Sequence, residues 1–440
     1  MLDTCETRGK IPVHSLYNGS RATLSEDKLA MRIAIIGSGV SGLVAALLLN
    51  ERHDVTIFEA RAQVGGHVST IDVTDEEARL HSIDMGFIVY NERNYPLFTK
   101  LLSQLGVESQ TSNMSFGVRC DRTGVEYSSA TLRTLFAQRR NLFRPRFHSM
   151  VRDILRFNRE AGPAIRNGSA DLSLGEYLEK AQFSSALSDQ YLLPMGSALW
   201  SIPQGRVLDM PAAFFVGFFE NHGMLTVNDQ PDWRVIKGGS IRYVEALTAP
   251  FRDKIRTSTP VRSVSRRHAH VVVDGEPFDQ VVFACHSDQA LAMLEDPTNR
   301  ERKILEALPY QKNDVVLHTD TSVLPRTRRA WAAWNYHVPP EDSTQATVTY
   351  NMNELQTLEA TKTYCVTLNA TDSIDPDLIL HQSSFSHPVY TRPGMIAQKR
   401  HGEISGIDRT HYCGAYWGYG FHEDGVRSGV EVAKRFGIDL

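Results

Sequence analysis

Residues 32–66 read RIAIIGSGVSGLVAALLLNERHDVTIFEARAQVGG, and this stretch decides the fold. The apolar run at residues 33–36 predicts a buried parallel strand, and the Ala- and Leu-rich residues 40–50 predict a helix. A second strand is expected at residues 55–59. This order of strand, glycine-rich turn, helix and strand predicts an α/β fold with a Rossmann-type sheet that binds a dinucleotide.

The turn itself carries the spacing that a pyrophosphate requires. Gly37 permits a tight turn, Gly39 lets the backbone approach the phosphates, and Gly42 allows the helix to pack closely on the strand. The helix then presents free N–H groups and the positive end of its dipole to the phosphates. Glu59, 17 residues after Gly42, ends the second strand and is placed to accept hydrogen bonds from a ribose.

The residues that follow separate FAD from NAD as the expected cofactor. The run EARAQVGG at residues 59–66 resembles the extended fingerprint of the flavin-containing amine oxidoreductase superfamily, which includes monoamine oxidases, phytoene desaturases and protoporphyrinogen oxidases. In that superfamily the glycine pair lets the backbone pass close to the FAD diphosphate and ribityl chain. Most members have Arg where this chain has His67. The resemblance therefore implies FAD, held without a covalent bond.

Two further motifs support the same resemblance, which covers nearly all of residues 31–440. DMGF at residues 84–87 resembles a turn that approaches the isoalloxazine, and CGAYWGYGFHEDG at residues 413–425 resembles a second FAD motif where a helix begins beneath the flavin. A helix N-terminus there favours the anionic reduced ring. The expected FAD contacts are Gly37, Ser38, Gly39, Val40, Ser41, Gly42, Glu59, Ala60, Arg61, Gly65, Gly66, His67, Met85, Gly86, Phe87, Val261, Gly414, Phe421, His422 and Glu423.

Three short sequence segments resemble one subfamily more closely. They are ACHSDQAL at residues 284–291, LHTD at residues 317–320 and GFHEDG at residues 420–425. The subfamily consists of FAD-binding oxidoreductases that often accompany cyclopropane-fatty-acid synthases. Its resemblance implies a lipid or acyl substrate, and a lipid methyltransferase as a possible partner.

The chain has no second GxGxxG and hence no evident NAD(P)H site, so substrate C–H or N–H bonds would supply the electrons as hydride to flavin N5. His422 and Glu423 are the candidate catalytic residues, because a histidine titrates near working pH. Both could instead belong to a helix N-terminus, and Asp424 is expected to cap that helix. Amine oxidases, which this chain resembles, hold a lysine near N5. Lys312 could serve as that lysine here, but Asn313 could equally face the flavin.

The resemblance to amine oxidases also suggests which aromatic residues could surround the substrate and whether a cysteine could bond to the flavin. Phe421 falls near one aromatic of their substrate cage, and Trp417 and Tyr419 are neighbouring candidates. Residues 383–411 contain no cysteine, so the cysteinyl–flavin bond of monoamine oxidases is not expected.

The pattern of elements along the chain predicts a discontinuous arrangement. Residues 31–95, 235–295 and 395–440 are expected to form the FAD-binding domain. Residues 96–234, mostly helical in pattern, and residues 296–394 are expected to form an inserted α+β substrate domain. Residues 1–30 are polar and lack an apolar signal core, which indicates a disordered leader.

A basic and aromatic stretch lies at residues 133–159. It combines Arg133, Arg139, Arg140, Arg144, Arg146, Arg152, Arg156 and Arg159 with leucine and phenylalanine residues. This mixture suits an anionic membrane surface, where each basic residue contributes about 1 kcal/mol. A solvated helix face is the other interpretation.

Composition bears on three further properties: nucleic-acid binding, the state of the cysteines and metal binding. A formal net charge of −4 argues against a nucleic-acid-binding surface. The five cysteines are scattered, which favours reduced thiols and a cytoplasmic protein that could associate peripherally with a membrane. His318, Asp320 and His337 fit no standard ligand spacing, so we expect no metal.

The sequence therefore predicts an FAD-dependent oxidoreductase whose substrate is a lipid acyl chain, as a desaturase or oxidase of a modified fatty acid. Three alternatives stay open: an amine oxidase, a flavin-binding partner of a lipid methyltransferase, and a polyene desaturase or isomerase.

Overall fold

A five-stranded parallel sheet forms in the computed structural model, which describes residues 30–226, 230–341 and 345–440. Its strands lie in the order β10-β2-β1-β14-β20, and all four pairings are parallel. They are β1 (Arg32–Ile36), β2 (Asp54–Phe58), β10 (Ile255–Arg256), β14 (Gln280–Phe283) and β20 (Thr410–Tyr412). The predicted α/β class with a Rossmann-type sheet is confirmed.

Alternate residues of β1 enter two separate cores, as the period of a strand requires. Ile33 and Ile35 pack beneath helices α1 (Val40–Leu49), α2 (Pro96–Leu105), α10 (Ile241–Thr248) and α15 (His422–Arg435). Ala34 and Ile36 pack on the opposite face, against an antiparallel sheet and two helices. That second layer comprises β11 (Val264–Arg266), β12 (Val271–Val273), β13 (Glu276–Phe278), α11 (Ser287–Met293) and α12 (Asn299–Leu305).

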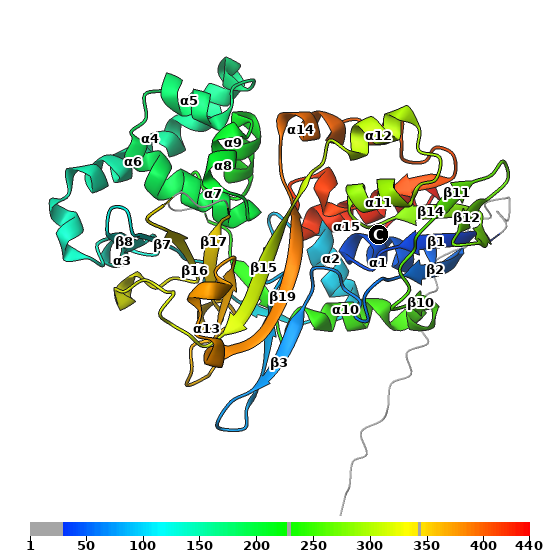
Figure 1. The fold of residues 1–440 in the computed structure, drawn as a ribbon, viewed down its shortest axis with the longest axis horizontal. Helices are drawn as coiled ribbons and strands as arrows, with labels where there is room; N and C mark the ends of the chain where they lie inside the picture. The colour runs from blue at the N-terminus through cyan, green and yellow to red at the C-terminus, as the bar shows by residue number, and fades with distance from the viewer. Residues whose placement is uncertain (1–29, 227–229, 342–344) are drawn as a thin grey trace, which may run out of the picture. The chain divides into compact units, whose positions relative to one another are not determined.

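The last helix packs directly on the first, as Figure 1 shows for α15 and α1. A Cβ atom added at Gly429 would lie 2.5 Å from the Ser41 carbonyl oxygen, so only glycine permits this approach. The contact brings the start of α15 beside the glycine-rich turn, although nearly 400 residues separate them. The two FAD motifs of the sequence are therefore neighbours in space.

A second, seven-stranded sheet lies beside this unit, in the order β19-β15-β18-β17-β16-β7-β8 (Figure 1). All of its pairings are antiparallel except that between β16 and β7. Its strands are β7 (Phe116–Cys120), β8 (Val125–Ser128), β15 (Tyr310–His318), β16 (Trp334–Val338), β17 (Thr347–Asn351), β18 (Cys365–Leu368) and β19 (Ile379–Pro388).

Most of residues 132–221 are helical, as the sequence predicts, and pack on this second sheet. The helices are α3 (Leu132–Leu135), η1 (Arg139–Phe143), α4 (Pro145–Ala164), α5 (Leu174–Lys180), α6 (Ser185–Leu187), α7 (Leu193–Trp200), α8 (Gln204–Asp209) and α9 (Ala212–Asn221). The β7–β8 hairpin within the predicted helical region was not expected. Its turn at residues 121–124 ends in Gly124 with φ of +64°, a signal that the sequence does contain.

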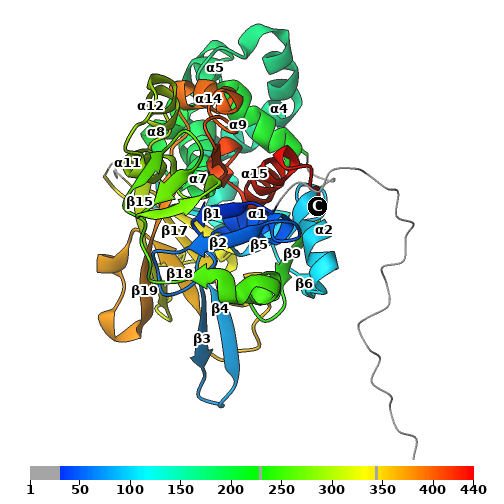
Figure 2. The ribbon, with the colours of Figure 1, turned by 90° about the vertical axis from the view of Figure 1, so that its right-hand side faces the viewer.

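Smaller elements complete the described chain. A hairpin of β3 (Thr70–Thr74) and β4 (Leu80–Asp84) projects from the two sheets (Figure 2). A three-stranded sheet joins β5 (Val89–Asn91), β9 (Trp233–Ile236) and β6 (Ser109–Thr111). Two short helices, α13 (Met352–Leu355) and α14 (Arg392–Gln398), and the 3-10 turns η4 (Ala249–Lys254) and η5 (Arg328–Ala330) lie between strands.

The alternating residues 261–264 predict a strand from the sequence, and this prediction is wrong for most of its length, because β11 begins only at Val264. Residues Met31–Leu440 form one compact unit. The division of that unit into two domains stays a prediction. The leader predicted for residues 1–30 lies, except for Ala30, outside the described residues.

Candidate FAD and substrate site

A single large cavity joins the two sheets. Its volume is about 1470 Å³, larger than the roughly 300–1,000 Å³ typical of small-molecule sites. One part of its wall is the glycine-rich turn after β1, and another comes from the seven-stranded sheet and the helices that cover it. The space suffices for a dinucleotide together with a second ligand.

Nearly all of the predicted FAD contacts line this cavity. They are Gly37, Ser38, Gly39, Val40, Ser41, Glu59, Ala60, Arg61, Gly65, Gly66, His67, Gly86, Phe87, Val261, Gly414, Phe421 and His422. Gly42, Met85 and Glu423 stand outside the wall. Gly42 instead meets the predicted packing role, because an added Cβ would lie 2.1 Å from the Gly37 carbonyl oxygen.

The glycine-rich turn has the geometry of a phosphate cradle. Gly37 adopts φ of +108°, and its N–H donates to the Phe58 carbonyl at 2.8 Å. Gly39 is the N-cap of α1, and no side chain or acidic residue of the described chain caps the first turn of that helix. A Cβ added at Gly39 would meet no protein atom within 4 Å. The helix N-terminus thus faces open space, which fits an anionic diphosphate.

Glu59 lies at the end of β2 with a buried carboxylate. One of its oxygens accepts from the Ser38 amide at 2.9 Å and from the Ser38 hydroxyl at 2.5 Å, and the other accepts from the Arg61 amide at 2.9 Å. These bonds hold the carboxylate at the cavity wall. In this position the Glu59 carboxylate can accept a hydrogen bond from a ribose hydroxyl.

His67 links the glycine pair to the second sheet. Its Nε2 lies 3.2 Å from the Ser386 carbonyl oxygen of β19. The ring lies 5.4 Å from that of His387 and 6.1 Å from that of His286. Burial, with the neighbouring His286, lowers the pKa of His67 to about 4. A neutral imidazole here contacts the backbone of β19 and lines the cavity without adding charge.

His387 is neutral for the same reason. Burial lowers its pKa to about 3, and its Nδ1 accepts a hydrogen bond from the Asn313 side-chain amide at 2.9 Å. Asn313 is itself fully buried. If Nδ1 of His387 carried a proton, that N–H would face the N–H of the Asn313 amide. The hydrogen bond therefore keeps Nδ1 unprotonated and places the ring proton on Nε2.

His422 stands at the first position of α15 and lines the cavity. Its ring stacks on Phe87, with centroids 3.4 Å apart, and its Nε2 lies 2.9 Å from the Tyr243 hydroxyl. Burial lowers the pKa of His422 well below 6.5. An acid–base role needs a pKa near working pH, so this environment favours a neutral hydrogen-bonding role at the flavin edge.

The predicted catalytic role of Glu423 requires its carboxylate to face the cavity, but Glu423 does not line the cavity. Its carboxylate accepts from the amides of Leu97 and Phe98, at 3.2 and 3.0 Å, and so caps the N-terminus of α2. The side chain is buried away from the cavity wall, and burial raises its pKa. This placement favours a structural role. Asp424 accepts from the Phe421 amide at 3.1 Å, which confirms the predicted cap.

The lysine expected near the flavin ring is not in the wall. Lys312 is exposed and Asn313 is buried behind His387, and neither lines the cavity. From the β15–β19 pair the wall instead receives Tyr310, Ser384, Ser386, His387 and Pro388. The chain therefore departs from the amine oxidase arrangement at this position.

Of the three aromatic candidates for a substrate cage, only Phe421 lines the cavity. Its ring stacks on Phe218 with centroids 5.0 Å apart. Trp417 instead packs against His401 at 4.3 Å, and Tyr419 packs against Phe214 at 4.8 Å. Sequence proximity alone suggested the latter two residues.

Most of the cavity wall away from the nucleotide loop is apolar, with uncharged polar side chains such as Asn113, Asn158 and Gln230 among its residues. This part of the wall includes Phe116, Tyr127, Leu132, Leu135, Val151, Ile154, Leu155, Tyr191, Met195, Ala198, Leu199, Met224, Trp233, Trp334 and Tyr350. Among the described residues that line the cavity, the permanently charged ones are Glu59, Arg61 and Arg262, all at the nucleotide end. His222 also lines it, and burial lowers its pKa to about 4. The substrate space thus holds neutral side chains.

Several wall residues lie within quoted motifs but were not among the predicted FAD contacts. Cys285, His286 and Gln289 follow β14, and Ala415 and Tyr416 precede α15. The signal that could have found the first group is its position at the carboxyl end of a parallel strand, where ligands of such sheets bind. Nothing local marks the apolar residues, which α3, α4 and α7 bring together.

Comparisons with known proteins now identify the class. The family described as flavin containing amine oxidoreductase matches residues 40–436. The chain belongs to this family. It is an FAD-dependent oxidoreductase, and its cofactor is FAD. No curated protein is similar enough in sequence to count as a match.

Solved structures with the same fold include enzymes of different chemistry. Cyclohexylamine oxidase from Brevibacterium oxydans IH-35A aligns with a TM-score of 0.65 and 15% identity, over 93% of this chain and all of the other. A CLA-producing fatty acid isomerase from P. acnes aligns with a TM-score of 0.64 and 16% identity, over 94% of this chain and all of the other. Putrescine oxidase bound to putrescine aligns with a TM-score of 0.62 and 15% identity, over 93% of this chain and 99% of the other. At these identities the likeness shows the fold alone.

The histidines weighed in the sequence as metal ligands make ordinary hydrogen bonds. The Nε2 of His318 bonds Thr367 at 2.7 Å, and that of His337 bonds Asp121 at 2.8 Å. In the described part of the chain, no group of three or more His, Cys, Asp or Glu residues could hold a metal. Nor does any helix of the described ranges have the length and apolar character to cross a bilayer.

Proposed function

We propose that this enzyme oxidises a lipid acyl chain. The observation that carries the proposal is the apolar part of the cavity, whose described wall offers no carboxylate to a protonated amine and no cation to a polar substrate. An unbranched or modified acyl chain would bury methylene groups there, at about 0.8 kcal/mol each. The bound FAD would accept a hydride at N5 from a C–H bond of the chain.

The protein would position the acyl chain beside the flavin and exclude water from the substrate space. Phe421 and Phe218 form an apolar wall beside the start of α15, and His422 is held by Tyr243 and Phe87. The neutral histidines His67 and His387 keep added charge away from this region. The fatty acid isomerase with the same fold acts on a fatty acid, which is compatible with the proposal.

Amine oxidation is the second candidate, because Phe421 lies where an aromatic cage residue is expected and amine oxidases share the fold. The two are separated by mixing the enzyme anaerobically with phospholipid in detergent micelles, or with cyclohexylamine. We expect loss of oxidised-flavin absorbance with the lipid, and a lipid product lighter by two hydrogens. Rapid bleaching by the amine alone would contradict the proposal.

A variant pair sharpens the test. Leu135→Trp narrows the apolar part of the cavity, whereas Leu208, partly buried on α8, does not line it. We expect Leu135→Trp to lower kcat/KM for a long acyl chain about tenfold, since about 1.4 kcal/mol of chain burial would be lost. Leu208→Trp should leave kcat/KM unchanged at equal flavin content. Equal losses in both variants would count against an acyl chain in this space.

A further inference from the structure

The apolar end of the cavity reaches the surface at α3 and α4. Leu132 is 78% exposed and Leu155 is 55% exposed, and both also line the cavity. A residue that lines a cavity while largely exposed marks its opening. The substrate space therefore opens between these two helices.

Exposed apolar side chains gather around this opening. Of nine large hydrophobic residues exposed in the described chain, four lie within residues 132–155: Leu132, Leu142, Phe143 and Leu155. Phe143 is 85% exposed. The ring of Phe136, at the end of α3, packs 5.6 Å from that of Phe147 in α4, so α3, η1 and α4 form one surface.

Uncompensated positive charge surrounds the same residues. Within the described residues, Arg133, Arg139, Arg140 and Arg144 form no ion pair with a carboxylate, whereas Arg146, Arg152, Arg156 and Arg159 do. Among the described residues, Arg140 donates to the Gly124 carbonyl and to the Gln138 side chain. The charge of the first four arginines is thus available to a partner.

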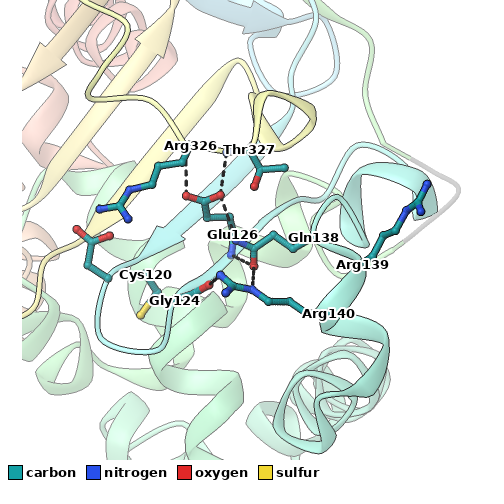
Figure 3. Close-up of a pocket in the computed structure, with 9 residues that line it drawn as sticks. Cys120, Gly124, Glu126, Gln138, Arg139, Arg140, Arg326 and Thr327 are labelled. Carbon is teal, nitrogen blue, oxygen red and sulfur yellow. Dashed lines mark hydrogen bonds between the residues drawn. The ribbon is translucent and has the colours of Figure 1, made fainter.

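Tertiary structure adds a further arginine to this group. A pocket of about 490 Å³ is lined by Arg139, Arg140 and Arg326 together with the carboxylates of Glu126 and Asp121 (Figure 3). The buried Glu126 carboxylate accepts from the amides of Arg326 and Thr327, both at 2.9 Å. These bonds hold the segment before η5 against β8 and bring Arg326 to the other two arginines. Asp121, the second carboxylate of the pocket, pairs with Arg119 at 3.1 Å, so Glu126 alone is left to offset the three arginines and positive charge remains in excess.

We propose that this surface docks on an anionic lipid bilayer and that acyl chains enter the cavity from it. We define the docking face as Leu132, Leu142, Phe143, Leu155, Arg133, Arg139, Arg140, Arg144 and Arg326. The apolar residues enter the interface and the arginines bind lipid phosphates, a combination typical of peripheral membrane surfaces. Uptake of acyl chains by this route rests on the proposed function, whereas docking does not.

The test is sedimentation of the FAD-loaded enzyme with vesicles of phosphatidylcholine, with and without phosphatidylglycerol. We expect binding to the anionic vesicles, weakened by salt. Arg139→Glu should lower the partition coefficient about fivefold or more, and the Leu142→Ser/Phe143→Ser double variant about tenfold or more. Flavin content and thermal midpoint report whether each variant is folded.

Matched controls come from outside the docking face. Leu380 on β19 is 44% exposed, and Arg252 on η4 is exposed without a carboxylate partner among the described residues. Leu380→Ser and Arg252→Glu should bind vesicles like the unchanged enzyme. Failure of the unchanged enzyme to sediment with anionic vesicles would overturn the proposal, as would equal losses in the controls.

Reaction in detergent micelles separates this proposal from the function. If vesicles bind but no acyl lipid reduces the flavin in micelles, docking stands and the acyl function fails. If micellar lipid reduces the flavin while anionic vesicles do not bind, the function stands and docking fails.

Discussion

Two glycines of the nucleotide loop show that one residue type can serve opposite purposes. A Cβ at Gly42 would collide with the loop backbone at 2.1 Å, so that glycine is needed for the fold. A Cβ at Gly39 would enter open cavity, and Gly39 has φ of −68°, which any residue adopts. Gly39 is therefore needed for the ligand and not for the chain.

We accordingly expect Gly39→Ala to fold like the unchanged protein but to bind FAD at least about tenfold more weakly, a loss of about 1.4 kcal/mol. Titration of the apoprotein with FAD and its thermal midpoint measure the two effects. Gly205→Ala is the matched control, because Gly205 also has free space around its Cβ position but lies on α8, outside the cavity wall. Unaltered FAD affinity in Gly39→Ala would show that the diphosphate lies elsewhere.

Among the elements, α15 does more than present its N-terminus to the cavity. It packs on α1 through Gly429 and holds α2 through the Glu423 carboxylate. Both neighbours contribute to the core beneath the parallel sheet. The motif at its start thus places Phe421 and His422 in the cavity wall and uses the next residue, Glu423, for structural hydrogen bonds.

This division predicts separate effects for adjacent residues. Glu423→Ala leaves the amides of Leu97 and Phe98 without their acceptor, and loss of such a cap costs about 1–2 kcal/mol of unfolding free energy. We expect a lower urea midpoint with the kcat of the flavin-loaded fraction retained. His422→Ala removes a buried ring that stacks on Phe87, so it should lower the urea midpoint as well, but it should also lower the kcat of the flavin-loaded fraction. Loss of kcat in Glu423→Ala at full flavin content would restore its predicted catalytic role.

For the molecule as a whole, the cavity is built where two sheets from interleaved segments meet. In the described chain, Cys285 is the one free cysteine in its wall, and it lies with the nucleotide loop rather than on β19. Burial raises the pKa of this thiol, which keeps it protonated and unreactive. The wall from β19 offers serines and His387 in place of a thiol.

We therefore expect denaturation in acid to release all of the FAD into solution, since we find no nucleophilic thiolate in the described wall. The yellow colour should pass through a membrane that retains the protein, and chromatography of the filtrate should show intact FAD. Flavin that stays with the denatured chain would contradict the non-covalent binding predicted from the sequence. The Cys285→Ser variant would then show whether this thiol is responsible.

The partnership with a lipid methyltransferase stays a prediction at this scale. Gel filtration of the two proteins mixed at equal concentration would measure it directly. Co-elution of both proteins in one peak is the expected result, and separate peaks at all salt concentrations would count against it.

The sequence alone determined the parallel sheet, the flavin family and most of the nucleotide wall. It could do so because close backbone approach depends on glycines at fixed local spacing, such as Gly37 and Gly39. Tertiary structure alone decided that Glu423 caps α2, that Lys312 faces solvent and that Leu132 and Leu155 flank an opening. Each of these depends on which distant segments pack together, and no local spacing encodes such contacts.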